Sequence, residues 1–207
     1  MIPDLSVILL AAGASTRMGV PKALLPWGER TVLEHILGTI REAGLTQVLV
    51  VTGAHHQEMA ERLPPGTASL VFNPDWNTGM GGSIRTGMGY LQQIWPQTRA
   101  VLILLADQPL IGPEYLKNMV AMYEDAGQEG LIASKHMDGL GVPALFSRTF
   151  FRALSELPEG QGAKQLIQRN KEHCLVADPG ETIRDMDTPE AYRDLLRHAG
   201  HLNNNPS

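Results

Sequence analysis

Several features that mark particular classes of protein are scarce or missing in this chain of 207 residues. Its one cysteine, Cys174, excludes an internal disulfide and a zinc site built from several cysteines, and it fits a reducing compartment. With a net charge of −5, the chain lacks the basic excess that drives sequence-independent binding of DNA or RNA. We therefore expect no disulfide and no nucleic-acid partner.

Long apolar segments and a secretion signal are also missing. The longest apolar runs, such as residues 101–106, are far shorter than the ~20 residues of a membrane helix. Near the N-terminus, Asp4 stands where a signal peptide carries lysine or arginine. The sequence therefore predicts a cytoplasmic protein with no membrane partner, and its 43% hydrophobic content is sufficient for a globular core.

What the chain does have is a regular alternation of strand-like and helix-like segments. Short apolar runs predict strands at residues 6–11, 47–52, 69–72, 100–106, 130–134, 142–146 and 174–177. Helical periodicity predicts helices at residues 31–43, 58–63, 80–93, 112–127, 149–157, 163–168 and 189–199. This alternation indicates an α/β fold with a mainly parallel sheet covered by helices. We expect one domain over residues 1–199 and a disordered tail over 200–207, which are polar and aperiodic.

The first expected strand runs into a loop of small residues that is followed by two basic residues. In the stretch "AAGASTRMGVPK", Ala11, Ala12 and Gly13 allow a ligand to approach the main chain, whose N–H groups can bind an anion. Arg17 and Lys22 add positive charge. The stretch contains neither GxGxxG nor GxxxxGK[ST], so dinucleotide-binding and P-loop interpretations are poor. A tight glycine turn followed by a solvated basic pair is the alternative without a function.

Acidic residues after two extended segments could hold Mg²⁺. Asp107 ends the most apolar strand, and ligands of open α/β sheets bind outside the carboxyl ends of the strands. Asp185 and Asp187 alternate along an extended segment, so their carboxylates should point to opposite faces and at most one should reach the site. We favour Asp187 as a second metal ligand beside Asp107. Turn formation and helix capping are the alternative roles of these acids.

A further segment places glycines and a serine at the start of an expected helix. Gly81, Gly82 and Ser83 in "NPDWNTGMGGSIRTG" could present main-chain N–H groups to a phosphate or another polar group. A flexible loop with helix capping is the alternative. The seven histidines show no metal-ligand spacing and no GxSxG occurs, which argues against a zinc site and against acyl-enzyme chemistry.

Five motifs together resemble those of the MobA-like nucleotidyltransferases, and more closely those of their molybdopterin cytidylyltransferase branch. They are "LAAGASTRMGVPKALLPW", "NPDWNTGMGGSIRTGM", "LLADQPLI", "GVPALFS" and "DMDTPEAY", in the order and spacing of the family. The resemblance implies a Rossmann-like three-layer sandwich of the nucleotide-diphospho-sugar transferase type. It also implies a Mg²⁺-dependent reaction in which a phosphate of the acceptor attacks the α-phosphorus of a nucleoside triphosphate and releases pyrophosphate.

The resemblance further implies roles for individual residues. The implied nucleotide-binding set comprises Ala11, Ala12, Gly13, Ser15, Arg17, Lys22, Gly81, Gly82 and Ser83. Its first three members would line the base and ribose, and its last three would lie near the base or the acceptor. Arg17 and Lys22 would contact the triphosphate and act in catalysis with Asp107, while Asp107 and Asp187 would hold Mg²⁺.

Details of these motifs indicate the nucleotide and the acceptor. Two alanines before Gly13 resemble the cytidylyl branch, so we expect CTP, a molybdopterin-type phosphate as acceptor and a molybdoenzyme as recipient of the product. The chain departs from the branch at "GLGVPALF" and "EGQGAKQLI", both on the acceptor side. Two alternatives stay open: a nucleotidyltransferase with another nucleotide or with a sugar or polyol phosphate acceptor, and a catalytically silent carrier of nucleotide or cofactor.

Overall fold

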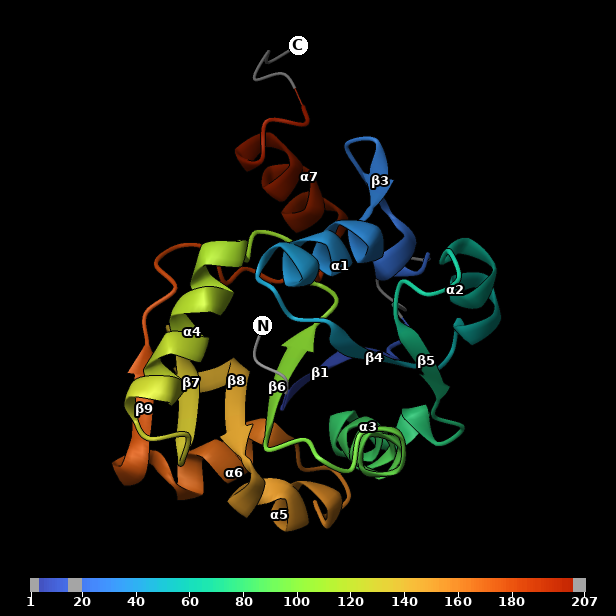
Figure 1. The fold of residues 1–207 in the computed structure, drawn as a ribbon. Coiled ribbons are helices and arrows are strands. Elements are labelled where there is room, and N and C mark those ends of the chain that lie inside the picture. The colour runs from blue at the N-terminus through green and yellow to red at the C-terminus, as the bar shows by residue number, and fades with distance from the viewer. Residues whose placement is uncertain (1–3, 15–19, 203–207) are drawn as a thin grey trace.

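A seven-stranded sheet forms the centre of the molecule in the computed structural model, which describes residues 4–14 and 20–202 (Figure 1). Its strands are β1 (Leu5–Ala11), β4 (Gln47–Thr52), β5 (Ser69–Phe72), β6 (Ala100–Leu105), β7 (Leu131–His136), β8 (Gly139–Ser147) and β9 (Cys174–Ala177). They lie in the order β5-β4-β1-β6-β8-β7-β9. β8 is antiparallel to β6 and β7, and the other neighbouring pairs are parallel. The prediction of a mainly parallel sheet is confirmed.

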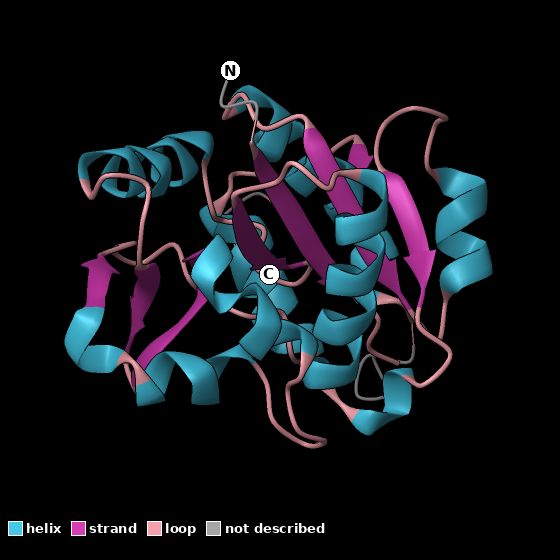
Figure 2. Ribbon diagram, turned by 60° about the horizontal axis from the view of Figure 1, so that its bottom comes forward, coloured by secondary structure: helices cyan, strands magenta, loops and turns pink. Residues whose placement is uncertain are grey.

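Helices cover both faces of this sheet and give a three-layer sandwich (Figure 2). They are α1 (Val32–Glu42), α2 (His56–Arg62), α3 (Met80–Ile94), α4 (Pro113–Asp125), α5 (Phe151–Ser155), α6 (Ala163–Arg169) and α7 (Pro189–His198). α1, α4 and α7 pack on one face, whereas α3, α5 and α6 pack on the other. Within the described part of the chain, none of the helices has the length and apolarity needed to cross a bilayer.

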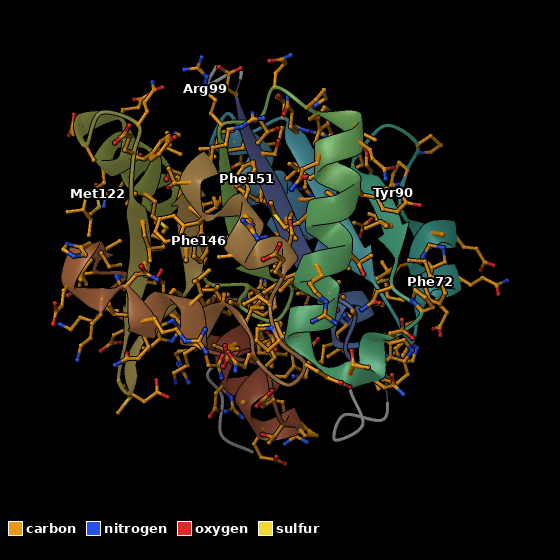
Figure 3. All side chains as sticks on the ribbon, turned by 90° about the horizontal axis from the view of Figure 1, so that it is seen from below. Phe72, Tyr90, Arg99, Met122, Phe146 and Phe151 are labelled. Carbon is orange, nitrogen blue, oxygen red and sulfur yellow. The ribbon has the colours of Figure 1, made fainter. Side chains whose placement is uncertain are left out.

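The core has two halves because successive side chains of a strand point to opposite faces of the sheet. In β1, Leu9 belongs to the half under α1 and Ile8 to the half under α3. Phe146 and Phe151 lie inside the second half, whereas Tyr90 lies at the surface (Figure 3). β1 and β6 are buried on both faces, which explains why residues 100–106 form an uninterrupted apolar run.

The largest differences in length from the expectation occur in one helix and one strand. The expected helix at residues 149–157 is a 3-10 turn, Arg148–Phe150, followed by the short helix α5. The expected strand at residues 142–146 is the longer β8, because residues 139–141 also pair with β7. Residues 139–141 read Gly-Leu-Gly, which gives no alternation of apolar and polar side chains, so the sequence does not predict this pairing. The register of β7 and β8 shifts next to Pro143, which has no N–H to donate.

The described residues 200–202, which belong to the expected tail, contact the rest of the molecule, and the disorder of the tail stays a prediction. The backbone N–H of His201 donates to the carbonyl of Leu196 at 2.9 Å. The His201 ring packs edge-on against Trp27, with 5.2 Å between the ring centroids. Trp27 belongs to a small hairpin of β2 (Pro26–Trp27) and β3 (Arg30–Thr31), which thus provides the aromatic surface against which His201 packs. Residues 203–207 lie outside the described part.

The start of α1 carries the capping box that the sequence predicts. Thr31 is the N-cap, and its hydroxyl accepts a hydrogen bond from the backbone N–H of Glu34 at 3.2 Å. In return, the Glu34 carboxylate accepts from the backbone N–H of Thr31 at 2.7 Å. Two N–H groups without a helical partner are thus satisfied where the hairpin enters the helix.

We expect the substitution Thr31→Ala to lower the free energy of unfolding by about 1 kcal/mol, because the N–H of Glu34 loses its acceptor. Urea denaturation followed by circular dichroism measures this loss. Thr31→Ser is the matched control, since it keeps the hydroxyl and should retain most of the stability. Equal stability of the alanine and serine variants would contradict the importance of the cap.

Candidate active site

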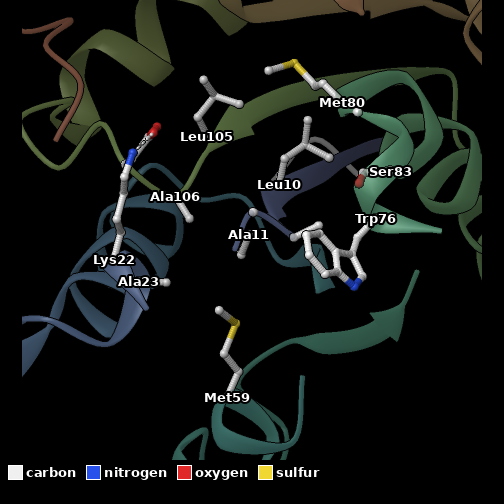
Figure 4. Close-up of a pocket in the computed structure, with 14 residues that line it drawn as sticks. Leu10, Ala11, Lys22, Ala23, Met59, Trp76, Met80, Ser83, Leu105 and Ala106 are labelled. Carbon is white, nitrogen blue, oxygen red and sulfur yellow. Dashed lines mark hydrogen bonds and ion pairs between the residues drawn. The ribbon is translucent and has the colours of Figure 1, made fainter. Parts of the chain in front are cut away.

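The carboxyl ends of β1, β4 and β6 meet at one edge of the sheet, where a pocket of about 350 Å³ opens (Figure 4). Its walls come from the chain after β1, the 3-10 turn Lys22–Leu24, the helix α2, the start of α3 and the chain after β6. Parallel strands place their following loops together at such an edge, which is where open α/β sheets bind ligands. The topology therefore brings together the loops that the sequence singles out.

The small residues after β1 lie in the wall of this pocket. Ala11 and Ala12 are buried, and Gly13 is exposed and has open space where a side chain would stand. Gly13 therefore leaves its main chain accessible to a ligand, as the lack of a side chain predicts, whereas Ala11 and Ala12 form a buried part of the wall. Ser15 and Arg17 lie outside the described residues, so their predicted nucleotide contacts stay predictions.

Lys22 joins two acids that arrive from distant parts of the chain. Its ammonium donates to Asp187 Oδ1 at 2.6 Å and to Asp107 Oδ2 at 3.3 Å. Lys22 sits in the turn after the small-residue loop, Asp107 follows β6, and Asp187 precedes α7. The structure thus brings together one predicted basic residue and both predicted metal ligands.

The Asp107 carboxylate of this cluster has a shifted pKa and is incompletely hydrogen-bonded among the described residues. Burial raises the pKa of Asp107 above its ordinary value of 3.8; the Lys22 ammonium opposes this shift, and the negative charge of Asp185 adds to it. Asp107 Oδ1 is buried and has no hydrogen-bond partner in the described part of the chain. Burial acts to lower the pKa of Lys22, but the hydrogen bond and charge of Asp187, together with Asp107, raise it overall. A buried oxygen without a donor among the described residues is free to accept a ligand atom or a metal ion at this point.

The two aspartates of the segment before α7 have different partners. Asp187 contacts Lys22, whereas Asp185 Oδ1 accepts a hydrogen bond from Gln108 Nε2 at 2.8 Å. The segment is not a strand, and it is tied to the site because the backbone N–H of Met186 donates to the Asp107 carbonyl at 3.0 Å. Contacts with distant parts of the chain, and not strand alternation, therefore direct Asp187 toward the Lys22 ammonium and Asp185 toward the buried Gln108.

The residues at the start of α3 divide into one that lines the pocket and two that pack tightly. Ser83 lines it and accepts a hydrogen bond from Asn73 Nδ2 at 3.1 Å. A Cβ on Gly81 would stand 2.0 Å from the Gln161 carbonyl oxygen, and one on Gly82 would stand 2.7 Å from Thr78 Oγ1. Close packing therefore accounts for both glycines, and their predicted contact with a nucleotide stays a prediction.

Three further residues at the pocket do not stand out in the sequence. Trp76 and Met59 give the pocket an apolar side, and in Figure 4 Trp76 lies across the pocket from Lys22. Gly53 supports this side, since a Cβ there would stand 2.3 Å from the Ala12 carbonyl and 2.6 Å from Trp76 Cβ. Gly53 directly follows a strand, and this position is the signal that could have identified it.

The donor set at this site suits a small hard cation that also binds phosphate. Mg²⁺ is commonly held by one or two carboxylates together with substrate phosphates and water. Asp107 and Asp187 supply two carboxylates, and the unpartnered Oδ1 of Asp107 offers a ligand oxygen. In residues 4–14 and 20–202, no cluster of three or more acidic, histidine or cysteine side chains could hold a metal ion. The residues therefore fit a metal that binds with its nucleotide.

Two relatives match nearly the whole chain. The purine catabolism protein PucB of Bacillus subtilis (strain 168) is 30% identical and covers 95% of this chain and 98% of its own length. A nicotine blue oxidoreductase of Paenarthrobacter nicotinovorans is 31% identical and covers 94% of this chain and 98% of its own. Their names describe different activities, so similarity at this level does not fix a substrate.

Solved structures share the fold. The crystal structure of Rv0371c from Mycobacterium tuberculosis H37Rv in complex with manganese has a TM-score of 0.75 and 28% identity, and the match covers 94% of this chain and 98% of that one. Nucleotidyltransferases of lower identity match the same architecture. The predicted nucleotide-diphospho-sugar transferase fold is confirmed. The profile of the MobA-like NTP transferase domain matches residues 7–174, and the chain therefore belongs to this family of nucleotidyltransferases.

Proposed function

We propose that the protein transfers the CMP moiety of CTP to the phosphate of a molybdopterin-type acceptor and releases pyrophosphate in a Mg²⁺-dependent reaction. The observation that carries this proposal is the convergence of Lys22, Asp107 and Asp187 at one end of the pocket, which lies at the carboxyl ends of the parallel strands. A triphosphate with its metal needs both signs of charge in one place, and this cluster supplies them.

Few catalytic groups are needed for such a transfer. An acceptor phosphate oxygen is itself the nucleophile that forms the new bond to the α-phosphorus, and pyrophosphate leaves with the electrons of the broken bond. The protein has to align the two substrates and oppose the charge that grows on the leaving group. Lys22 would do so from the described part of the site, and Arg17 from the loop before it. When bound at Asp107 and Asp187, Mg²⁺ would supply Lewis-acid neutralisation of phosphate oxygens.

The opposite side of the pocket suits a nucleobase. Lys22, which contacts Asp107, lies at one side, whereas Trp76 and Met59 provide apolar surface away from it (Figure 4). Ala11 lies between Lys22 and Trp76 in the same view (Figure 4). We infer that the triphosphate lies against Lys22 and that the base lies against the indole of Trp76, because aromatic side chains stack on bases of every kind.

The choice of CTP and of a molybdopterin-type acceptor rests on the motifs of the sequence. The two alanines before Gly13 favour CTP, and the resemblance of the other motifs favours the acceptor. A panel of CTP, GTP, UTP and ATP with molybdopterin and with sugar or polyol phosphates, followed by pyrophosphate release, tests this choice. CTP and molybdopterin should be the preferred pair. Turnover only with another pair would replace the substrates, and CTP binding without any turnover would favour a silent carrier.

We expect Asp107→Asn to reduce pyrophosphate release at least about a hundredfold, because the variant loses the carboxylate that would hold the metal on the triphosphate. Steady-state assay with saturating Mg²⁺ measures the loss. Asp125→Asn is the matched control, since Asp125 is an exposed residue at the far end of α4 and should retain wild-type activity. Full activity of the Asp107 variant would refute the assignment.

We expect Trp76→Leu to weaken CTP binding by roughly tenfold, because the base loses an aromatic face while the pocket keeps an apolar side chain. Isothermal titration calorimetry with Mg²⁺ present measures the dissociation constant. Trp76→Phe keeps an aromatic ring and should bind nearly as well as the wild type. An unchanged dissociation constant in the leucine variant would place the base elsewhere.

The ionised carboxylate of Asp107 should lower the free energy of unfolding near neutral pH, because burial disfavours its charge. The pKa of Asp107 is raised in the folded protein, so the fold favours the protonated acid, and this contribution to stability is lost as the pH rises through that pKa. An asparagine amide at this position would be neutral at every pH. We therefore expect Asp107→Asn to be more stable than the wild type near neutral pH, with a difference that shrinks as the pH falls toward 3.8.

Denaturant unfolding of both proteins across this pH range measures the effect. The raised pKa of Asp107 reflects its burial, which outweighs the attraction of Lys22. If the wild type is more stable than Asp107→Asn at neutral pH, the folded protein stabilises the ionised carboxylate, and the prediction is wrong.

A further inference from the structure

The Lys22 ammonium occupies the position where two carboxylates face each other. Its nitrogen lies 2.6 Å from Asp187 Oδ1 and 3.3 Å from Asp107 Oδ2, and the side chain is only 17% exposed. A cation that contacts both acids at once keeps them together, since two carboxylates repel each other without one. The ammonium therefore fills the role of a counter-ion in this cluster.

A divalent cation at the same acids would compete with Lys22 for the same oxygens. Two positive centres within about 4 Å of each other repel strongly in a partly buried site. Asp107 Oδ1 has no hydrogen-bond partner among the described residues, but a metal bound there would still lie next to the ammonium that contacts Oδ2 of the same carboxylate. A metal that takes the acids must therefore displace the ammonium from at least one of them.

The lysine is built so that its charge can move while its backbone stays. Its four-carbon stem is flexible and its three donors rotate. The turn that carries it is anchored, because Leu24 N–H donates to the Pro21 carbonyl at 2.9 Å and the next residue, Ala23, is buried. Lys22 also lines the pocket, so a triphosphate there lies within the range of its side chain.

We propose that Lys22 is an exchangeable counter-ion: its ammonium holds Asp107 and Asp187 together in the ligand-free protein and moves to the triphosphate when the metal–nucleotide complex takes its place. The proposal rests on the proposed function for the assignment of these acids to the metal. It predicts that the metal alone binds weakly and that nucleotide and metal favour each other's binding, since the phosphates attract the ammonium away from the acids.

The test is a titration with Mn²⁺ alone, without nucleotide, in which electron paramagnetic resonance measures the free ion. We expect Lys22→Met to bind one Mn²⁺ about tenfold or more tightly than the wild type, because the competing charge is gone while the acids stay. Lys22→Arg is the matched control and should bind as weakly as the wild type. Adding Asp107→Asn to Lys22→Met should abolish the gain.

The outcomes separate this proposal from the proposed function. Failure of the wild type to release pyrophosphate with any nucleotide would refute the transferase assignment but would leave the Mn²⁺ comparison valid. Equal, weaker or absent Mn²⁺ binding in Lys22→Met would overturn the counter-ion role even if the enzyme is active. Circular dichroism checks the fold of each variant, and Lys22→Gln repeats the test should the methionine variant be unfolded.

Discussion

One ammonium group joins three segments that the sequence keeps far apart. Asp107 is 85 residues and Asp187 is 165 residues from Lys22, yet both contact its side chain. The first acid requires β6 in the centre of the sheet, and the second requires the segment that is tied to Asp107 through Met186. The charged end of the pocket therefore exists only when the sheet and the chain before α7 are both in place.

The rest of the pocket follows from close packing at the same edge of the sheet. Gly53 lets the chain after β4 approach Ala12 and Trp76, and Gly81 lets α3 approach the loop at Gln161. These contacts place an aromatic side chain opposite the charged cluster. The pocket is thereby polar at one side and apolar at the other, as a nucleoside triphosphate is. The Asp107 carboxylate, whose Oδ1 has no hydrogen-bond partner among the described residues, fits a site arranged for a ligand more than for stability.

Much of this organisation could be predicted from the sequence, for identifiable reasons. Uninterrupted or alternating apolar runs predict the strands, and the alternation with helices predicts the parallel sheet. Since parallel strands end at one edge, the order of the strands and loops along the chain is enough to expect Ala12, Lys22 and Asp107 to meet there. The Thr31 capping box is equally local, because it depends on two residues three positions apart.

Features that depend on contacts between distant loops could not be predicted. No sequence pattern near Gly81 or Gln161 predicts that these two residues pack together. From the sequence alone, Gly81 therefore resembles a ligand-binding glycine. The choice between Asp185 and Asp187 is made by Gln108 and Lys22, because the segment is not a strand and its side chains do not alternate regularly. Trp76 stands outside the sheet, where its close approach to the chain after β4 depends on Gly53.

The central claim is that Lys22, Asp107 and Asp187 serve a single metal-bound triphosphate. The most direct measurement is a crystal structure with CTP and Mn²⁺, in which anomalous scattering locates the metal. The account predicts a Mn²⁺ peak bonded to both carboxylates and to the phosphates, with the Lys22 ammonium on a phosphate oxygen. A triphosphate bound away from Lys22, or a metal peak that neither aspartate contacts, would contradict it.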